Sequence, residues 1–202
     1  MGSQVAPLVA EAYLWKADQL GIDAQGAILN AGTVRNDIHR GDLTLGQIYE
    51  LLPFSETLVA LDLSGRQIRS ALTHGVSRSL ASPDQDGAFP YVAGMRYIAA
   101  PSRTAEGIIL SLDIQRPDGT WQAVADQQNY RIIVSKFLAS GGDGYDVLAK
   151  ASGYRYDTGF AANEVFMEWA TKSKILDVPA IPRVKLQNVS PPSSTGRSET
   201  PH

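Results

Sequence analysis

The sequence predicts an α+β domain in which a mixed sheet packs against helices. Segments with helical and with strand-like patterns follow one another without the regular alternation that marks a doubly wound parallel sheet. Pro117, Asp118 and Gly119 form a strong turn signal, which indicates at least one antiparallel hairpin. With 202 residues, the chain is long enough to bury one sizeable core or two small ones.

Helices are predicted where apolar residues recur at spacings of three and four. The first is the clearest, because Leu8, Ala12 and Trp15 fall on one helical face. For the second, a short helix, either Asp42 or Thr44 can serve as the N-cap. The helices expected cover residues 5–20, 43–49, 66–76 and 161–172.

Strands are predicted where short segments are wholly apolar or alternate between apolar and polar residues. The turn signal at residues 116–121 lies between two of these segments and marks the expected hairpin. The strands expected cover residues 26–30, 57–65, 94–99, 107–116, 130–137 and 183–186.

These elements place one domain at residues 1–187 and a tail at residues 188–202. Nine of the fifteen tail residues are Ser, Thr or Pro, and none is aromatic. Such a segment cannot bury enough apolar surface to offset the conformational entropy lost on ordering. We therefore expect the tail to be disordered.

The composition is that of an ordinary soluble globular protein, with 44% hydrophobic residues and a formal net charge of −3. The 18 basic residues are scattered among 21 acidic ones, which argues against nucleic acid as a partner. The absence of cysteine excludes disulfides and thiolate metal sites. No segment approaches the roughly 18 apolar residues of a membrane span. The N-terminus also lacks a basic leader, so we expect a mature or excised piece.

No catalytic or metal-binding constellation is predicted. The histidines at positions 39, 74 and 202 form no pair at metal-ligand spacing, and we interpret them as surface or helix-face residues. No serine has the surroundings of a nucleophile elbow. The glycine-rich segment "SGGDGYD" at residues 140–146 follows a strand, but it lacks the Lys-Ser/Thr pair of a phosphate-binding P-loop.

Several aromatic and polar side chains nevertheless follow predicted strands in turn-rich segments. Aromatic faces stack on a base for about 1–3 kcal/mol each. A carboxylate accepts from both hydroxyls of a ribose, and a guanidinium pairs with phosphate oxygens. A structural interpretation is also open, in which the two phenylalanines fill the core and the aspartate caps a turn. The residues concerned are Asn30, Arg35, Phe54, Phe137 and Asp143.

Four short motifs occur in order along the chain. They are "NAGTVR" at residues 30–35, "GDLT" at 41–44, "LPF" at 52–54 and "KFLASGGDGY" at 136–145. Together, and at these separations, they resemble the C-terminal domain of the 5'-nucleotidase and UDP-sugar hydrolase family. The resemblance extends from about residue 5 to residue 187.

The resemblance implies a division of labour between two domains. In the family, an N-terminal metallophosphoesterase domain holds two divalent metal ions and hydrolyses the phosphate ester, while the C-terminal domain binds the nucleoside. This chain has no ligand set for two metals, so we expect no cofactor in it and no hydrolysis by it alone. The implied partners are a nucleoside or nucleotide and the N-terminal domain. The implied location is periplasmic, secreted or cell-surface.

Carried over position by position, the resemblance implies how the nucleoside is held. Phe54 and Phe137 would sandwich the base between their rings. Asp143 would hold the ribose hydroxyls, and Asn30 would contact the base. A nucleoside clamp at these four positions is therefore what the family likeness predicts.

The resemblance also implies a phosphate contact and a reason for the glycines. Arg35 would pair with the phosphate, and Gly141 and Gly142 would let the backbone pass close to the sugar, because neither has a Cβ. The chain departs from the family pattern at three nearby positions, one of which is Lys136, where an asparagine is frequent. Thr33 replaces a glycine, and Glu56 stands beside the stacking ring where a small or amide residue is commoner.

Two other functions stay open at this point. The chain could be a free-standing, non-catalytic nucleotide-binding module, or the related domain of a sulfur-oxidation hydrolase. Aromatic residues at both stacking positions favour a nucleotide over a sulfur substrate. The preferred nucleotide, whether a monophosphate, NAD, a UDP-sugar or a cyclic phosphate, also stays open.

Overall fold

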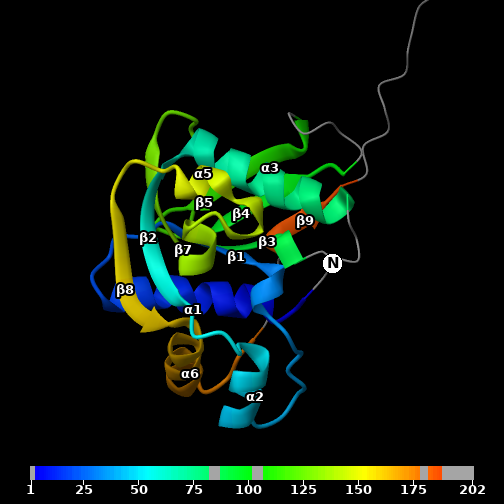
Figure 1. The fold of residues 1–202 in the computed structure, drawn as a ribbon, viewed down its shortest axis with the longest axis vertical. Helices are drawn as coiled ribbons and strands as arrows, with labels where there is room; N and C mark the ends of the chain where they lie inside the picture. The colour runs from blue at the N-terminus through cyan, green and yellow to red at the C-terminus, as the bar shows by residue number, and fades with distance from the viewer. Residues whose placement is uncertain (1–2, 82–86, 102–106, 178–181, 188–202) are drawn as a thin grey trace, which may run out of the picture.

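The computed structural model describes residues 3–81, 87–101, 107–177 and 182–187. Its strands form two mixed sheets within these ranges, one of five strands and one of four, and helices pack around them (Figure 1). The α+β class is therefore confirmed. The predicted disordered tail at residues 188–202 lies outside the described residues.

The central sheet consists of β1 (Gly26–Asn30), β2 (Thr57–Ser64), β3 (Pro90–Ala93), β7 (Asn129–Ser135) and β8 (Arg155–Ala161). Their order across the sheet is β3-β1-β7-β2-β8. β1 runs parallel to β7, whereas the pairs β1–β3, β2–β7 and β2–β8 are antiparallel. β1 is buried at every position, as its mostly apolar sequence requires.

The smaller sheet consists of β4 (Met95–Ala99), β5 (Ile109–Gln115), β6 (Trp121–Ala123) and β9 (Val184–Leu186), in the order β6-β5-β4-β9. The hairpin predicted at residues 116–121 is present, but its second strand is β6. The expected partner at 130–137 instead contributes β7 to the central sheet. The prediction of the partner was wrong because three residues are too few to show a strand pattern.

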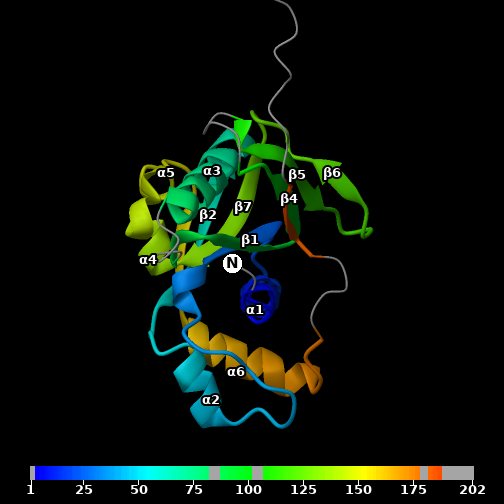
Figure 2. The same ribbon diagram turned by 90° about the vertical axis from the view of Figure 1, so that its right-hand side faces the viewer.

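Helices cover both faces of the central sheet. α1 (Ala6–Gln19) lies against β1 and β3, and α6 (Ala162–Ser173) packs on the outer side of α1 (Figure 2). α3 (Gly65–Ala81) lies on the opposite face of the sheet. All three were predicted from the sequence, although α3 continues beyond the expected end at residue 76.

The structure of the short helix α2 (Leu45–Leu51) shows which of the two candidate residues is its N-cap. The Thr44 hydroxyl accepts from the Gln47 amide at 3.3 Å, and the Gln47 side-chain oxygen accepts from the Thr44 amide at 2.8 Å. This reciprocal pair is a capping box, so Thr44 is the cap and Asp42 is not. After α2 the chain passes through Pro53, which places Phe54 in a loop just before β2.

The elements that the sequence did not predict are short or exposed. β8 is an edge strand whose side chains are mostly exposed, so it lacks the alternation that marks a half-buried strand. The helices α4 (Lys136–Ala139) and α5 (Asp146–Ala149) have about one turn each and show no periodic repeat. The 3₁₀ turns η1 (Ala31–Thr33) and η4 (Gly142–Gly144) follow β1 and α4.

The core surrounds the central sheet and includes fully buried aromatic residues. Phe166 on α6 is 0% exposed, and Tyr97 is 1% exposed. The Tyr97 hydroxyl donates to the Pro90 carbonyl at 2.6 Å. Burial raises the pKa of Tyr97 well above its usual range, which keeps the hydroxyl protonated as a donor.

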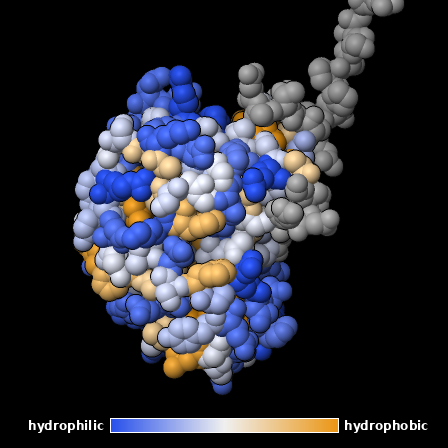
Figure 3. Space-filling model, in the orientation of Figure 1, coloured by the Kyte–Doolittle hydropathy of each residue, from blue (hydrophilic) through white to orange (hydrophobic). Residues whose placement is uncertain are grey.

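On the surface of this protein, the exposure of an apolar side chain does not by itself identify a functional site. Among the described residues, no helix combines the length and the apolar content needed to cross a bilayer. Apolar residues lie in separate patches among hydrophilic ones on the face shown in Figure 3. Single exposed apolar side chains are normal on globular proteins. Exposed aromatic rings therefore identify a site only where other ligand-binding groups lie beside them.

Candidate functional site

Four strands have one end at the same edge of the central sheet because of their directions. β1 and β7 are parallel neighbours, so they end at the same edge. β2 begins at this edge, because it runs antiparallel to β7 with Leu58 opposite Ser135. β3 begins there too, with Pro90 opposite Asn30. The loops that carry the predicted side chains thus converge, although 113 positions separate Asn30 from Asp143.

Asn30 is buried at the end of β1, with 3% of its surface exposed. Its amide nitrogen donates to Asp143 Oδ2 at 2.8 Å and to the Gly87 carbonyl at 3.2 Å. Its amide oxygen accepts from the Thr33 hydroxyl at 2.6 Å. Two acceptors on one side and a donor on the other set the orientation of the amide. Asn30 therefore supports the Asp143 carboxylate, while its expected contact with a base stays a prediction.

Asp143 lies in η4 with a φ of 53°, in the left-handed region that few non-glycine residues adopt. The flanking Gly141 and Gly144 also have positive φ values, 89° and 80°. No helix of the described chain uses the Asp143 side chain as a cap, because its carboxylate accepts from Asn30 instead. Within the described residues, the second carboxylate oxygen accepts no hydrogen bond from the protein.

His74 on α3 contacts the same turn through a hydrogen bond to its backbone. His74 Nε2 lies 2.9 Å from the carbonyl oxygen of Asp143, and since a carbonyl only accepts, the imidazole donates this hydrogen bond. The His74 ring also meets the Tyr145 ring edge-on, with 5.3 Å between centroids. The Tyr145 hydroxyl donates to the Ala88 carbonyl at 2.6 Å. Burial, and then the charge of Asp143, raise the pKa of Tyr145 far above its usual range.

The two phenylalanines are exposed, so neither fills the core. Phe54 is 46% exposed and Phe137 is 42% exposed. Phe137 lies in the first turn of α4, whose N-cap is the Ser135 hydroxyl, accepting from the Leu138 amide at 3.2 Å. Arg35 lies over the Phe54 ring, with 5.5 Å from its guanidinium carbon to the ring centroid. Phe137 therefore lies on the turn that carries Asp143, and Arg35 and Phe54 lie together in the loops before and after α2.

The two glycines before Asp143 serve different purposes. A Cβ on Gly142 would lie 2.5 to 2.6 Å from three atoms of the Phe137 ring, so the ring face packs directly on the glycine backbone. Gly141 has more room, since its nearest neighbour would be 3.4 Å away, but its φ of 89° favours glycine. The space left by Gly142 is thus occupied by the Phe137 ring, and the expected clearance for a sugar stays a prediction.

His74 and Thr33 are the site residues that sequence reasoning missed. A single histidine on a helix face carries no spacing signal, and 69 positions separate it from its partner Asp143. Thr33 was noted only as a departure from the family pattern, although its hydroxyl orients Asn30. Only the pairing of strands and the packing of α3 bring these groups together.

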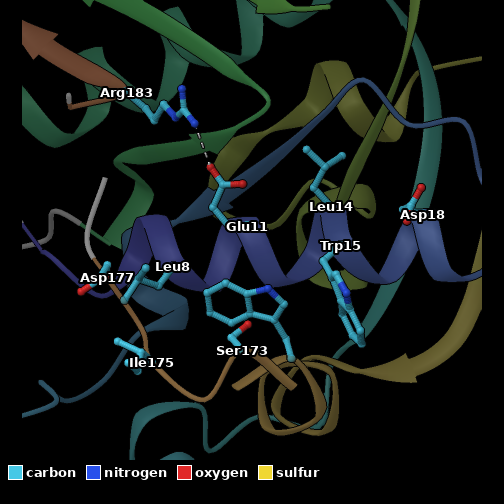
Figure 4. A pocket seen from close by; sticks show the side chains of 10 residues that line it. Leu8, Glu11, Leu14, Trp15, Asp18, Ser173, Ile175, Asp177 and Arg183 are labelled. Carbon is cyan, nitrogen blue, oxygen red and sulfur yellow. Dashed lines mark hydrogen bonds and ion pairs between the residues drawn. The ribbon is translucent and has the colours of Figure 1, made fainter. Parts of the chain in front are cut away.

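A separate pocket of about 630 Å³ lies between α1, the end of α6 and Arg183 (Figure 4). Its charged lining is mainly acidic, with Glu11, Asp18 and Asp177. Glu11 is paired with Arg183 at 3.3 Å. A phosphate would be repelled by this lining. The lining of this pocket therefore does not suit a phosphate group.

In the part of the chain that the structure describes, no group of three or more His, Asp or Glu side chains is placed to hold a metal ion. The sheet-edge site offers aromatic faces, a carboxylate and a guanidinium, which are groups that can contact a ligand. Residues 2–150, which contain all of these groups, match the family described as the 5'-nucleotidase, C-terminal domain. The chain belongs to this family.

Relatives of the 5'-nucleotidase C-terminal domain are longer than this chain. The trifunctional nucleotide phosphoesterase protein YfkN of Bacillus subtilis is 36% identical over 164 residues, which are 81% of this chain and 11% of the relative. A 5'-nucleotidase precursor from Thermus thermophilus has a TM-score of 0.84 at 35% identity, covering 93% of this chain and 36% of that one. The NAD nucleotidase of Haemophilus influenzae has a TM-score of 0.82 at 27% identity, covering 94% and 34%.

The contact between Gly142 and Phe137 leads to a testable prediction. In Gly142→Ala, the new Cβ would overlap the ring and force it away from its present rotamer, which costs about 0.5–1.5 kcal/mol. We expect adenosine affinity, measured by calorimetry, to fall roughly two- to tenfold. Gly46→Ala in α2 is the matched control, because its Cβ would meet nothing closer than 4.0 Å. Equal affinities of the two variants for adenosine would show that Gly142 does not determine the position of the Phe137 ring.

Proposed function

We propose that this chain is the nucleoside-recognition domain of a 5'-nucleotidase-type metallophosphoesterase. The observation that carries the proposal is the Asp143 carboxylate, oriented by Asn30 at 2.8 Å, at the sheet edge where two exposed phenylalanines project from neighbouring loops. Stacking faces beside a hydrogen-bond acceptor suit a base joined to a ribose. The family membership supports this assignment.

Each group has a proposed role in holding the nucleotide. The base lies between Phe54 and Phe137, and Gly142 backs the opposite face of the Phe137 ring. The free carboxylate oxygen of Asp143 accepts from the ribose hydroxyls. Arg35, which is exposed beside Phe54, turns toward the phosphate and pairs with its oxygens.

We further propose that the parent protein supplies the chemistry from a second domain. That domain would hold two divalent metal ions and hydrolyse the nucleotide to a nucleoside and phosphate, and the parent would lie in the periplasm, outside the cell or at the cell surface. The relatives are longer than this chain, and those compared bear names of nucleotide-cleaving enzymes. A free-standing binding module, the competing function, would lack such a domain in the parent gene product.

The proposed function is tested by a ligand screen on the purified chain. Because a ligand that binds only the folded state raises the melting temperature, adenosine, AMP, NAD, uridine and UDP-glucose are compared by thermal shift and calorimetry. We expect at least one of them to bind and glucose to have no effect. We also expect no phosphate release from AMP with Mg²⁺, Mn²⁺, Zn²⁺ or Co²⁺. A chain that binds none of the five, or that releases phosphate when free of contaminating phosphatase, would contradict the proposal.

A further inference from the structure

The turn that carries Asp143 is fitted to α3 on its inner side. A Cβ on Gly144 would lie 2.8 Å from two atoms of the His74 ring, so the turn approaches the imidazole as closely as only glycine permits. On α3 the next residue, Gly75, leaves room for the Tyr145 hydroxyl, which a Cβ there would overlap. The shapes of α3 and of the turn are therefore matched at successive positions.

Asp143 is held by two different groups at its two ends. Its side chain accepts from the Asn30 amide, and its main-chain carbonyl accepts from His74 Nε2–H at 2.9 Å. Its φ of 53° is uncommon for a residue with a Cβ and costs free energy that the surroundings must offset. The hydrogen bond from His74 fixes the direction of the carbonyl, and with it the backbone conformation from which the carboxylate projects.

We propose that His74 is a positioning residue for recognition of the ribose. It touches no ligand, but it holds the backbone of Asp143 in the conformation that presents the free carboxylate oxygen to the two ribose hydroxyls. This inference rests on the proposed function, in which Asp143 binds the ribose. It assigns a specific role to a histidine whose sequence context indicated only a helix face.

A positioning role differs from a general structural role in its ligand dependence. If His74 only stabilised the fold, its removal would weaken every ligand of the site to the same degree. If it positions Asp143, its removal weakens binding of adenosine, which has 2' and 3' hydroxyls, but not of 2',3'-dideoxyadenosine, which lacks both. The ratio of the two dissociation constants therefore isolates the proposed role.

The experiment compares His74 variants with wild type by calorimetry. Loss of one hydrogen bond predicts that His74→Ala lowers adenosine affinity roughly two- to tenfold. The affinity for 2',3'-dideoxyadenosine should change by less than about twofold, because stacking on the aromatic rings is retained. His39→Ala is the control, since His39 is exposed in the loop before α2. It should leave both affinities unchanged.

Two further variants, His74→Gln and His74→Asn, change the side chain less than Ala does, so they keep the test independent of folding. In His74→Gln the side-chain amide reaches about as far as Nε2 and donates an N–H, so we expect the wild-type ratio to return. In His74→Asn the amide reaches only as far as Nδ1, so the preference for adenosine over 2',3'-dideoxyadenosine should stay as low as in His74→Ala. Hydrogen exchange adds a readout without ligand. The amides of Gly144 and Tyr145, which donate within the turn at 3.1 Å, should exchange faster in His74→Asn than in His74→Gln.

The outcomes separate this inference from the function on which it rests. If wild type binds adenosine and 2',3'-dideoxyadenosine equally, the assignment of Asp143 to the ribose fails, and the role of His74 fails with it. If wild type discriminates but His74→Ala does so equally well, only the role of His74 is overturned. Equal weakening of both ligands in His74→Ala and His74→Asn also overturns it.

Discussion

Replacing Phe137 by Ala is expected to weaken adenosine binding roughly fivefold to more than a hundredfold, because one stacking face contributes about 1–3 kcal/mol per base. The ring is 42% exposed, so its removal creates no large cavity. Phe137 is a cleaner test than Phe54, since replacing Phe54 also removes the ring over which Arg35 lies. The measurement is calorimetric titration with adenosine.

A buried aromatic residue provides the comparison for stability. Phe166 is 0% exposed, and its replacement by Ala is expected to lower the free energy of unfolding by about 3–5 kcal/mol. Phe137→Ala should therefore melt close to wild type, whereas Phe166→Ala should melt far below it. If Phe137→Ala melts as low as Phe166→Ala, or binds adenosine as tightly as wild type, the stacking role of Phe137 is wrong.

Replacing Asp143 by Asn is expected to weaken adenosine roughly tenfold to a hundredfold, because hydrogen bonds to a charged group contribute about 1.5–3 kcal/mol. The variant keeps the shape of the side chain, and its amide oxygen still accepts from Asn30, as Oδ2 does at 2.8 Å. The other position becomes an NH₂ group, which cannot accept from a ribose hydroxyl. Binding of 2',3'-dideoxyadenosine should change little.

Asp146→Asn is the matched control for charge. Asp146 lies at the start of α5, is exposed, and pairs with Lys150 at 3.4 Å, so its replacement removes the same charge close by. Affinity for adenosine and its dideoxy analogue should remain at the wild-type level in this control. Should Asp143→Asn weaken both ligands equally, or should Asp146→Asn match its effect, Asp143 would not be the ribose ligand.

The hydrogen bonds around Asp143 predict how the effects of two substitutions combine. Asn30, which Thr33 orients, donates to the carboxylate of Asp143, and His74 donates to its carbonyl. Residues that act through one hydrogen-bonded network do not contribute independently. The loss of ribose selectivity in His74→Ala should therefore largely disappear when Asp143 is already Asn, since no ribose contact then remains to be positioned.

Much of the local structure could be predicted from the sequence. The helix at Ala6–Gln19, the strand at Gly26–Asn30 and the cap at Thr44 lie within the predicted segments. Helix periodicity, strand pattern and capping each depend on residues a few positions apart, so a short window contains the necessary information. Loop positions and the family motifs also brought out the candidate side chains of the site, including Phe137 and Asp143.

The tertiary structure decided everything that depends on which distant segments meet. The turn at residues 116–121 was predicted, but its partner strand Trp121–Ala123 was not, and the segment at 130–137 joined the other sheet. The bond from His74 to Asp143 joins residues 69 positions apart. Strand neighbours and helix placement follow from the burial of the whole apolar surface at once. By itself, then, the sequence determined the longer elements and brought out most of the candidate side chains. Packing determined the short elements, the contribution of His74 and Thr33, and which groups support one another.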